Sequence, residues 1–218
     1  MRANGIAVMC IQETHIPAAP FYTQDGYLII LSGGQSDQRE YAGVGFIIAP
    51  WAKQAVVSFI QQSSRLASLT LKVSGGTISL INAYAPQSGL DFEVRHQFFG
   101  DLHEFTNKVK GHGPIYTIGD FNARLHGNPA QETDVIGPFA WGNLEAHSGP
   151  TSNKDMLIEH CTSLDLVVAN TFIERPLEQR VTYYDLSAKP QNELSYTKFA
   201  EIDHILVESR WQTSVHII

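Results

Sequence analysis

The sequence predicts an α/β protein with a largely antiparallel first half and a second half in which helices and strands alternate. Short apolar runs bounded by polar residues or glycine recur along the chain, as expected of buried strands. Longer segments repeat apolar residues every three or four positions, which is typical of amphipathic helices. The 218 residues, 43% of them hydrophobic, suffice for one large domain with a substantial core.

The first half is expected to form strands that follow one another through short connections. Its apolar runs cover residues 7–11, 27–31, 44–49, 55–60, 66–73 and 77–84. The connections leave no room for a crossover helix between parallel strands, so these strands must run largely antiparallel. Gly75-Gly76 fits the tight turn of a hairpin between the last two runs.

The second half begins with the clearest helix, which we expect over residues 91–109. Its apolar side chains recur at helical spacing and should pack in the core: Val94, Phe98, Leu102, Phe105 and Val109. Ser152 and Asp155 fit a capping box that opens a second helix, ending near Leu164. Further strands are expected at 166–169, 181–184 and 201–207. The long polar stretch 124–151 has the length of loops that are functional or mobile.

The chain is organised around Gly119-Asp120-Phe121-Asn122, which follows the apolar strand 114–118. In an extended segment Asp120 and Asn122 would point the same way, while Phe121 would point back into the core. The carboxylate could act as an acceptor or a base, and the amide could donate to a phosphate oxygen or to water. The same four residues also fit a turn, and local chemistry does not separate the two interpretations.

Three more polar residues stand in or just beyond apolar strands: Glu13, Tyr84 and Asp203. Functional groups collect at strand ends in α/β proteins, so we expect these residues to converge with Asp120 and Asn122 in one cleft. Two of them have an alternative, because Glu13 also fits an exposed loop residue and Tyr84 a core aromatic. His204 should point to the opposite face from Asp203, and we interpret it as structural.

Charge and composition limit the partners. The formal net charge of −7 argues against a broad basic surface for nucleic acid, although a site that meets phosphates through a metal ion is compatible with it. No apolar run approaches the roughly 20 residues needed to span a bilayer, so we expect no membrane partner. Cys10 and Cys161 form neither a disulfide framework nor a zinc motif. As buried thiols they predict an intracellular, reducing compartment.

Four motifs together give a resemblance to a known family. Gln12-Glu13-Thr14-His15, Tyr84-Ala85-Pro86, Gly119-Asp120-Phe121-Asn122 and Ile202-Asp203-His204-Ile205 resemble, in order and spacing, the motifs of the endonuclease/exonuclease/phosphatase family. Each motif is short, but four in order over nearly all of the chain make the set specific. The sequence is most similar to the endonuclease domains of LINE-type retrotransposons and their domesticated relatives.

The resemblance implies a four-layer α/β sandwich like that of DNase I, in which two mixed sheets pack face to face between helices. It also implies Mg²⁺-dependent hydrolysis of phosphodiesters, with Mn²⁺ as a possible substitute, and nicking of DNA. Glu13 would be the principal metal ligand, since its carboxylate oxygens suit a hard cation.

Matching the motifs also assigns roles to the other site residues. Asp120 would orient or deprotonate the attacking water, and Asn122 would donate to the phosphate or to that water. Tyr84 would donate to the scissile phosphate as charge develops there. Thr182 would line the nucleic-acid groove, and Asp203 would orient a catalytic histidine.

The resemblance is incomplete at both ends. Family members begin with a strand whose last Asn shares the metal site, and they end on a strand with Ser-Asp-His. The sequence has no match to either, so the first and last strands are expected to be absent and activity to be low or lost. Two alternatives are a non-catalytic degenerate or domesticated copy and a phosphatase or phosphodiesterase that acts on small phosphoesters. In a full-length element, a reverse transcriptase would be fused to this domain.

Overall fold

The structure is a computed structural model in which residues 1–16, 21–33, 42–111, 113–125, 134–141, 152–184 and 199–216 are described. The chain divides into two units, each made of two separate segments. Unit 1 consists of Met1–Ala85 and Gly100–Gly119, and unit 2 of Pro86–Phe99 and Asp120–Ile218.

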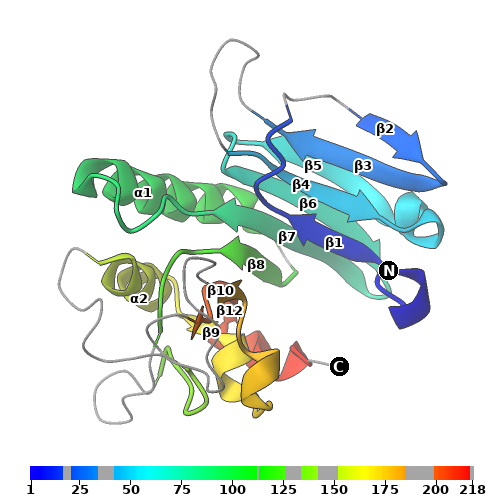
Figure 1. The fold of residues 1–218 in the computed structure, drawn as a ribbon. Helices are drawn as coiled ribbons and strands as arrows, with labels where there is room; N and C mark the ends of the chain where they lie inside the picture. The colour runs from blue at the N-terminus through cyan, green and yellow to red at the C-terminus, as the bar shows by residue number, and fades with distance from the viewer. Residues whose placement is uncertain are drawn as a thin grey trace. The chain divides into compact units, whose positions relative to one another are not determined.

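Unit 1 contains two β-sheets that pack face to face (Figure 1). One sheet has the strand order β1-β4-β3-β2 and is antiparallel throughout. The other runs β5-β6-β7-β8, with antiparallel pairing from β5 to β7. Their bounds are β1 (Val8–Ile11), β2 (Phe21–Gln24), β3 (Tyr27–Ser32), β4 (Val44–Ile48), β5 (Val56–Gln61), β6 (Leu66–Val73), β7 (Gly76–Tyr84) and β8 (Ile115–Asp120), with 3₁₀ turns η1 (Arg2–Asn4) and η2 (Pro50–Ala55).

Apolar side chains from both sheets form the core of unit 1. Ile30, Phe46 and Leu69 are fully buried between the sheets. The rings of Phe46 and Phe59 meet edge to face with their centroids 6.3 Å apart. Burial of each such side chain contributes about 1.5–3 kcal/mol, so the alternation of the strands accounts for the face-to-face packing.

A buried asparagine ties the two sheets of unit 1 together. Asn82, on β7, is fully buried, and its Nδ2 donates to the carbonyls of Ile11 (3.0 Å) and Gly45 (2.7 Å). Its Oδ1 accepts from Gln12 Nε2 at 2.6 Å. A strand of one sheet is thereby bonded to β1 and β4 of the other. Because both amide protons and the oxygen are used, this polar group is buried without an unpaired atom.

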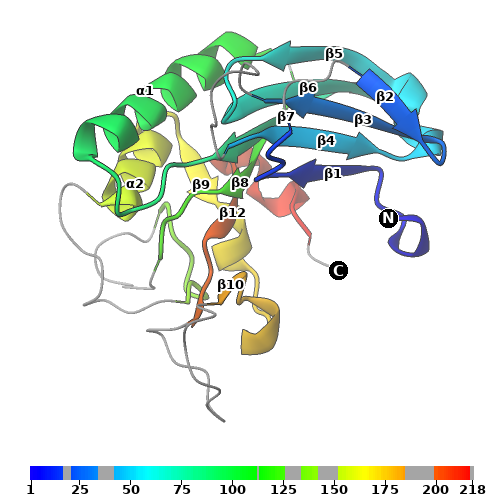
Figure 2. The same ribbon diagram turned by 45° about the horizontal axis from the view of Figure 1, so that its top comes forward.

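Unit 2 is built around helix α2 and two short pairs of strands (Figure 2). β9 pairs antiparallel with β12, β10 pairs antiparallel with β11, and α2 packs on β9. The bounds are α2 (Asn153–Ser163), β9 (Leu166–Val168), β10 (Tyr183–Tyr184), β11 (Phe199–Ala200) and β12 (Asp203–Glu208), with 3₁₀ turns η3 (Ala169–Phe172), η4 (Leu177–Gln179) and η5 (Ser209–Ser214). Helix α1 (Phe92–Val109) begins in the residues of unit 2 and ends in those of unit 1.

The start of α2 has the predicted cap. The backbone N–H of Asp155 donates to Ser152 Oγ at 3.1 Å, and that of Met156 donates to the Ser152 carbonyl at 3.1 Å. A cap of this kind contributes about 1 kcal/mol, which fixes where the helix begins.

The cysteines are free thiols, and burial raises the pKa of both. The pKa of the Cys10 thiol rises to about 12, and that of the fully buried Cys161 also rises. Neither thiol is therefore ionised near neutral pH. Separately, no helix in the described parts of the chain combines the length and apolarity that crossing a membrane requires.

The structure confirms the α/β class and the order of the predicted elements, with corrections. The burial of Val94 in α1 was predicted and is wrong, because its side chain is 50% exposed. Arg95 is buried instead, and it donates to the Leu90 carbonyl (2.9 Å) and to Asn153 Oδ1 (3.2 Å). The predicted aromatic core of the helix is correct, since Phe98 and Phe105 are buried.

Two strands were not predicted, and several predicted strands differ from the structure by one or two residues at an end. β2 and β11 each pair with a neighbouring strand, but four and two residues are too few to show an apolar period. The strand expected over 181–184 begins at Tyr183. Of the polar stretch 124–151, positions 126–133 and 142–151 lie outside the described residues.

We predict that Asn82→Ala lowers the free energy of unfolding by about 2–4 kcal/mol, because two carbonyls and the Gln12 amide lose their buried partner. Asn107→Ala, which removes an exposed amide from α1, should change it by less than about 0.5 kcal/mol. Urea unfolding of the three proteins measures both values. Equal stability of the Asn82 and Asn107 variants would contradict the role given to Asn82.

Candidate active site

Glu13 and Tyr84 form a hydrogen-bonded pair in unit 1. Tyr84, the last residue of β7, is 4% exposed, and its hydroxyl donates to Glu13 Oε1 at 2.7 Å. Glu13 follows the end of β1 and is exposed. The preceding Gln12 is held by Asn82 of β7, so the bond between the sheets also sets where Glu13 leaves the strand.

The backbone of Glu13 has a left-handed conformation, with φ of 52°. A residue with a Cβ pays roughly 1–2 kcal/mol for this conformation, so the surrounding bonds must hold it in place. Asn122 has the same conformation, with φ of 47°, and asparagine tolerates it better than glutamate. Both candidate site residues therefore leave their strands through a sharp turn.

Asp120 and Asn122 lie in a turn rather than in one extended segment. β8 ends at Asp120, whose Oδ1 accepts the backbone N–H of Asn122 at 2.8 Å. The predicted extended geometry through Asn122 is therefore wrong, and the turn interpretation holds from Asp120 onward. Phe121 between them is fully buried, as predicted.

A close backbone approach in unit 1 precedes Asp120. A Cβ on Gly119 would overlap the backbone carbonyl of Ala83. Only glycine fits at this position. The backbone at Gly119 therefore lies in close contact with the backbone at Ala83.

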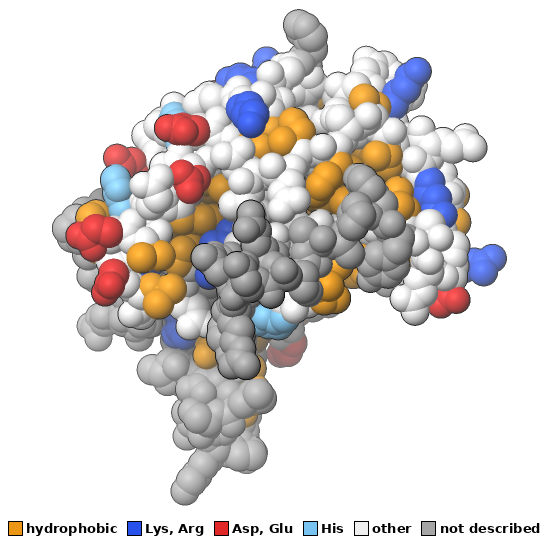
Figure 3. Space-filling model, turned by 90° about the horizontal axis from the view of Figure 1, so that it is seen from above, with side chains coloured by type: hydrophobic (Ala, Val, Ile, Leu, Met, Phe, Trp, Pro, Cys, Tyr) orange, Lys and Arg blue, Asp and Glu red, His pale blue; other side chains and the backbone are white. Residues whose placement is uncertain are grey.

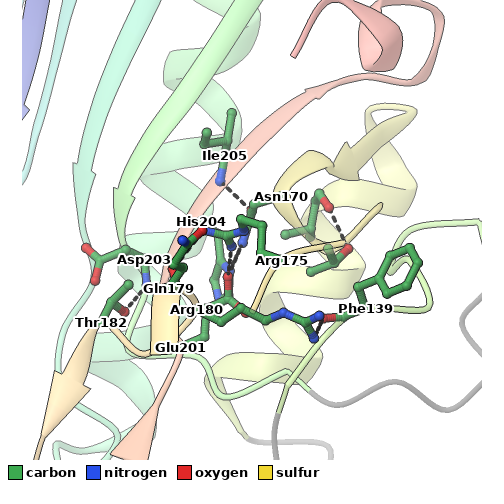
Figure 4. Close-up of polar contacts among 12 residues, drawn as sticks. Phe139, Asn170, Arg175, Gln179, Arg180, Thr182, Glu201, Asp203, His204 and Ile205 are labelled. Carbon is green, nitrogen blue, oxygen red and sulfur yellow. Dashed lines mark hydrogen bonds and ion pairs between the residues drawn. The ribbon is translucent and has the colours of Figure 1, made fainter. Parts of the chain in front are cut away.

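Thr182 and Asp203 are joined in unit 2. Thr182 Oγ1 accepts the backbone N–H groups of Ile202 (3.0 Å) and Asp203 (3.3 Å), as Figure 4 shows for Asp203. A hydroxyl oxygen has two lone pairs, so these bonds leave the O–H of Thr182 as a donor. Asp203 lies at the start of β12 with a half-buried side chain.

A buried polar cluster lies beside Asp203 (Figure 4). Asn170 donates to Glu201 Oε1 at 2.8 Å, its Nδ2 lies 3.3 Å from His204 Nδ1, and its Oδ1 accepts from Ile205 N at 3.0 Å. Arg175 forms an ion pair with Glu201 at 2.7 Å. Desolvation raises the pKa of Glu201, while its bonds to Asn170 and Arg175 act in the opposite direction.

His204 is a neutral core residue. It is 1% exposed, its Nε2 lies 2.9 Å from the Ala123 carbonyl, and burial lowers its pKa to about 4. The contact with a carbonyl assigns the ring proton to Nε2, which leaves Nδ1 to accept from Asn170. These contacts agree with the interpretation of His204 as structural. They also link the turn after Asp120 to the start of β12.

The predicted site residues thus form three pairs. Glu13 pairs with Tyr84 in unit 1, and Asp120 with Asn122 and Asp203 with Thr182 in unit 2. Their convergence in one cleft stays a prediction.

Sequence reasoning missed the residues that hold these pairs: Asn82, Asn153 and Asn170. Asn153 is buried and donates to the carbonyls of Pro86 (2.9 Å) and Phe121 (3.2 Å). For Asn82 and Asn170 the available signal was an asparagine inside or next to an apolar run, as in Ile81-Asn82-Ala83. Such an amide needs buried partners.

The donor set of Glu13 fits a hard divalent cation. Within the described residues, no three or more His, Cys, Asp or Glu side chains gather as a metal cluster. Mg²⁺ nevertheless keeps several waters and is commonly bound through one or two carboxylates. Glu13 offers an exposed carboxylate of which Tyr84 engages one oxygen.

The face drawn in Figure 3 shows no continuous basic patch among the side chains that are described there. A few Lys and Arg side chains lie near one another at the top of this view, and the others are scattered among neutral and hydrophobic atoms. This pattern agrees with the net charge of −7.

Solved structures share this fold. The chain matches the AP endonuclease LMAP from Leishmania major with a TM-score of 0.66 and 16% identity, over 98% of this chain and 73% of that one. The endonuclease domain of TRAS1, a telomere-specific non-LTR retrotransposon, matches with a TM-score of 0.61 and 14% identity, over 97% of this chain and 77% of that one. A protein of the endonuclease/exonuclease/phosphatase family from Leptotrichia buccalis matches with a TM-score of 0.59 and 12% identity, over 94% of this chain and 76% of that one. The fold is therefore that of the endonuclease/exonuclease/phosphatase structures, as predicted.

Curated proteins of similar sequence are longer. The chain is 23% identical over 215 residues to craniofacial development protein 2 of Bos taurus, which covers 99% of this chain and 33% of that protein. The corresponding protein of Tragulus javanicus is 24% identical over 211 residues, which are 97% of this chain and 34% of that protein. The chain thus spans about a third of the length of these relatives. No family model matches the sequence.

The left-handed backbone at Glu13 predicts an order of stability for two variants. Both Glu13→Gly and Glu13→Ala lose the bond to Tyr84, but glycine adopts this conformation without strain. Glu13→Gly should therefore be the more stable by about 1 kcal/mol in urea unfolding. An alanine variant as stable as the glycine variant would mean that Glu13 carries no strain.

The buried imidazole of His204 predicts a loss of stability in mild acid. Its folded pKa, about 4, lies below the ordinary 6.5, so its contribution is complete above pH 6.5. As pH falls from 6.5 to 4, the unfolded chain takes up a proton that the folded chain does not, and on the order of 3 kcal/mol is lost.

The difference in unfolding free energy between the parent and His204→Gln, followed from pH 7 to pH 4.5, isolates this effect. It should shrink as the pH falls, whereas the difference between the parent and Asn107→Ala, which removes no titratable group, should stay flatter. A His204 difference that is constant with pH would contradict the neutral assignment.

Proposed function

We propose that the chain is a divalent-metal-dependent phosphodiester hydrolase whose substrate is DNA, which it nicks. The observation that carries this proposal is the bond of 2.7 Å between Tyr84 and Glu13. It joins a donor suited to a phosphate oxygen and a carboxylate suited to a hard cation at the ends of two strands. The printed names of two structural neighbours, an AP endonuclease and a retrotransposon endonuclease domain, support the choice of DNA.

Each residue has a proposed part in the reaction. Glu13 binds Mg²⁺, or Mn²⁺ in its place, and the bound cation supplies positive charge that stabilises the charge developing on the phosphate. Tyr84 donates to a phosphate oxygen, and its rigid placement means that little reorganisation is needed. Asp120 accepts a proton from the attacking water or orients that water.

The remaining polar residues position the substrate. Asn122 presents its side-chain amide from a turn that the Asp120 carboxylate fixes at 2.8 Å. The hydroxyl of Thr182, with its oxygen used by two backbone N–H groups, donates outward to a phosphate of the nucleic acid. Asp203 orients a catalytic histidine. We also propose that, in a full-length element, a reverse transcriptase is fused to this domain.

A second candidate is hydrolysis of small phosphoesters by the same residues. The net charge of −7 favours it, because DNA binding draws on positive charge. Fold alone does not separate the two substrates. The same charge pattern also fits a non-catalytic copy.

We predict that the chain nicks supercoiled plasmid in Mg²⁺ slowly and that Asp120→Ala lowers the rate by on the order of 10²- to 10⁴-fold. EDTA should abolish nicking in both proteins. Asp134→Ala, at an exposed carboxylate of the same unit, serves as the matched control and should keep the parent rate.

Other outcomes separate the alternatives. Release of phosphate from a phosphomonoester without nicking would select the second candidate. Metal-stimulated nicking that survives Asp120→Ala would contradict the role of Asp120. No hydrolysis of any phosphoester would favour the non-catalytic copy.

A further inference from the structure

Arg65 contacts Tyr84 through both its backbone and its side chain. The two residues stand opposite each other one step beyond the β6–β7 ladder, whose last pair is Leu66 with Ala83. The Tyr84 N–H donates to the Arg65 carbonyl at 2.9 Å, and Arg65 Nη1 donates to the Tyr84 carbonyl at 3.2 Å. The pairing of β6 and β7 thus continues one residue further. There the Arg65 guanidinium, in place of a backbone N–H, donates to the Tyr84 carbonyl.

The guanidinium of Arg65 also covers the aromatic ring. Its central carbon lies 4.9 Å from the centroid of the Tyr84 ring, within the range of a cation–π contact. Arg65 is half-buried, so this contact is only partly screened by water. The backbone of Arg65 is itself held, because its N–H donates to Ser63 Oγ at 3.1 Å.

By fixing the ring, these contacts also fix the position of the Tyr84 hydroxyl, which is the group that belongs to the candidate site. The ring is fixed by its own burial and by Arg65, while the hydroxyl donates to Glu13 at 2.7 Å. A cation on the ring face draws electron density from the ring and makes the phenol a stronger hydrogen-bond donor. A neutral side chain of the same length would keep the packing but not this effect.

We propose that Arg65 is a positioning residue for Tyr84, which it orients and strengthens as a donor to Glu13 in the resting protein and to the substrate phosphate during reaction. The second part rests on the proposed function, but the first does not. A purely structural Arg65 would stabilise the end of the hairpin and leave the phenol unchanged. The two roles therefore differ in what happens at the Tyr84 hydroxyl of a folded variant.

The test is NMR of the 218-residue chain labelled with [¹³Cζ]tyrosine. Tyr84→Phe identifies the Tyr84 signal by its loss, and Glu13→Ala gives the signal of Tyr84 without its acceptor. In Arg65→Met the Tyr84 signal should move toward that position. Arg210→Met is the matched control, because Arg210 also covers an aromatic ring, that of Trp211 at 5.7 Å, and it should leave the Tyr84 signal in place.

Arg65→Lys keeps a cation without the planar fork and should give an intermediate signal. If circular dichroism shows that Arg65→Met does not fold, the Tyr84 signal of Arg65→Lys tests the proposal in its place. A Tyr84 signal at the parent position in the folded Arg65 variant would overturn the proposal.

Kinetics separate this inference from the proposed function. If the parent hydrolyses phosphodiesters, Arg65→Met should lower kcat by on the order of tenfold and leave KM within about twofold. A parent without hydrolysis contradicts the proposed function, while the NMR result still decides the role of Arg65. Hydrolysis with an unshifted Tyr84 signal leaves the proposed function standing and removes Arg65 from it.

Discussion

The structure of unit 1 depends on the amide of Asn82. Its bonds to two carbonyls and one side-chain amide connect β7 of one sheet to β1 and β4 of the other. Apolar packing brings two sheets together but does not fix how far one slides along the other. A fully bonded amide between them does, because only one alignment satisfies all its partners. That alignment brings Glu13 to the hydroxyl of Tyr84.

Unit 2 also contains two buried asparagines whose amides each bind several partners. Asn153 binds the carbonyls of Pro86 and Phe121, and Asn170 binds Glu201, His204 and Ile205. Both asparagines bind residues more than 30 positions away in the sequence. Each also lies one step from a candidate site residue rather than in the site itself, so the site side chains are placed by a rigid polar frame.

Much of the fold could be predicted from the sequence, because apolar periodicity reports burial directly. The β6 run over 66–73 matches its strand residue for residue, and the capping box at Ser152 marks the start of α2. The failures have physical causes. Periodicity counts apolar residues, so it placed Val94 in the core and overlooked Arg95, whose buried charge is bonded by Leu90 and Asn153. Strands of two to four residues are too short to show a period.

Motif resemblance selected the members of the candidate site, whose roles stay predictions, but it did not give their geometry. No local pattern indicates that Glu13 takes a left-handed backbone, and at Asp120 local chemistry left the turn and the extended segment equally open. The backbone of Glu13 depends on tertiary contacts of its neighbours, such as the bond of Gln12 to Asn82. The role of Arg65 depends on hairpin register, which follows from Gly75-Gly76 only once the turn has been assigned.

The central claim is that Glu13, held by the hydroxyl of Tyr84, is where a divalent cation binds. Paramagnetic broadening by Mn²⁺ tests it most directly, because the effect falls steeply with distance from the bound ion. Substoichiometric Mn²⁺ should broaden the ring signals of Tyr84 first, and Glu13→Gln should abolish that preference while Glu93→Gln, at an exposed carboxylate of α1, keeps it. Broadening of Tyr84 that is absent in the parent, or that persists unchanged in Glu13→Gln, would contradict the claim.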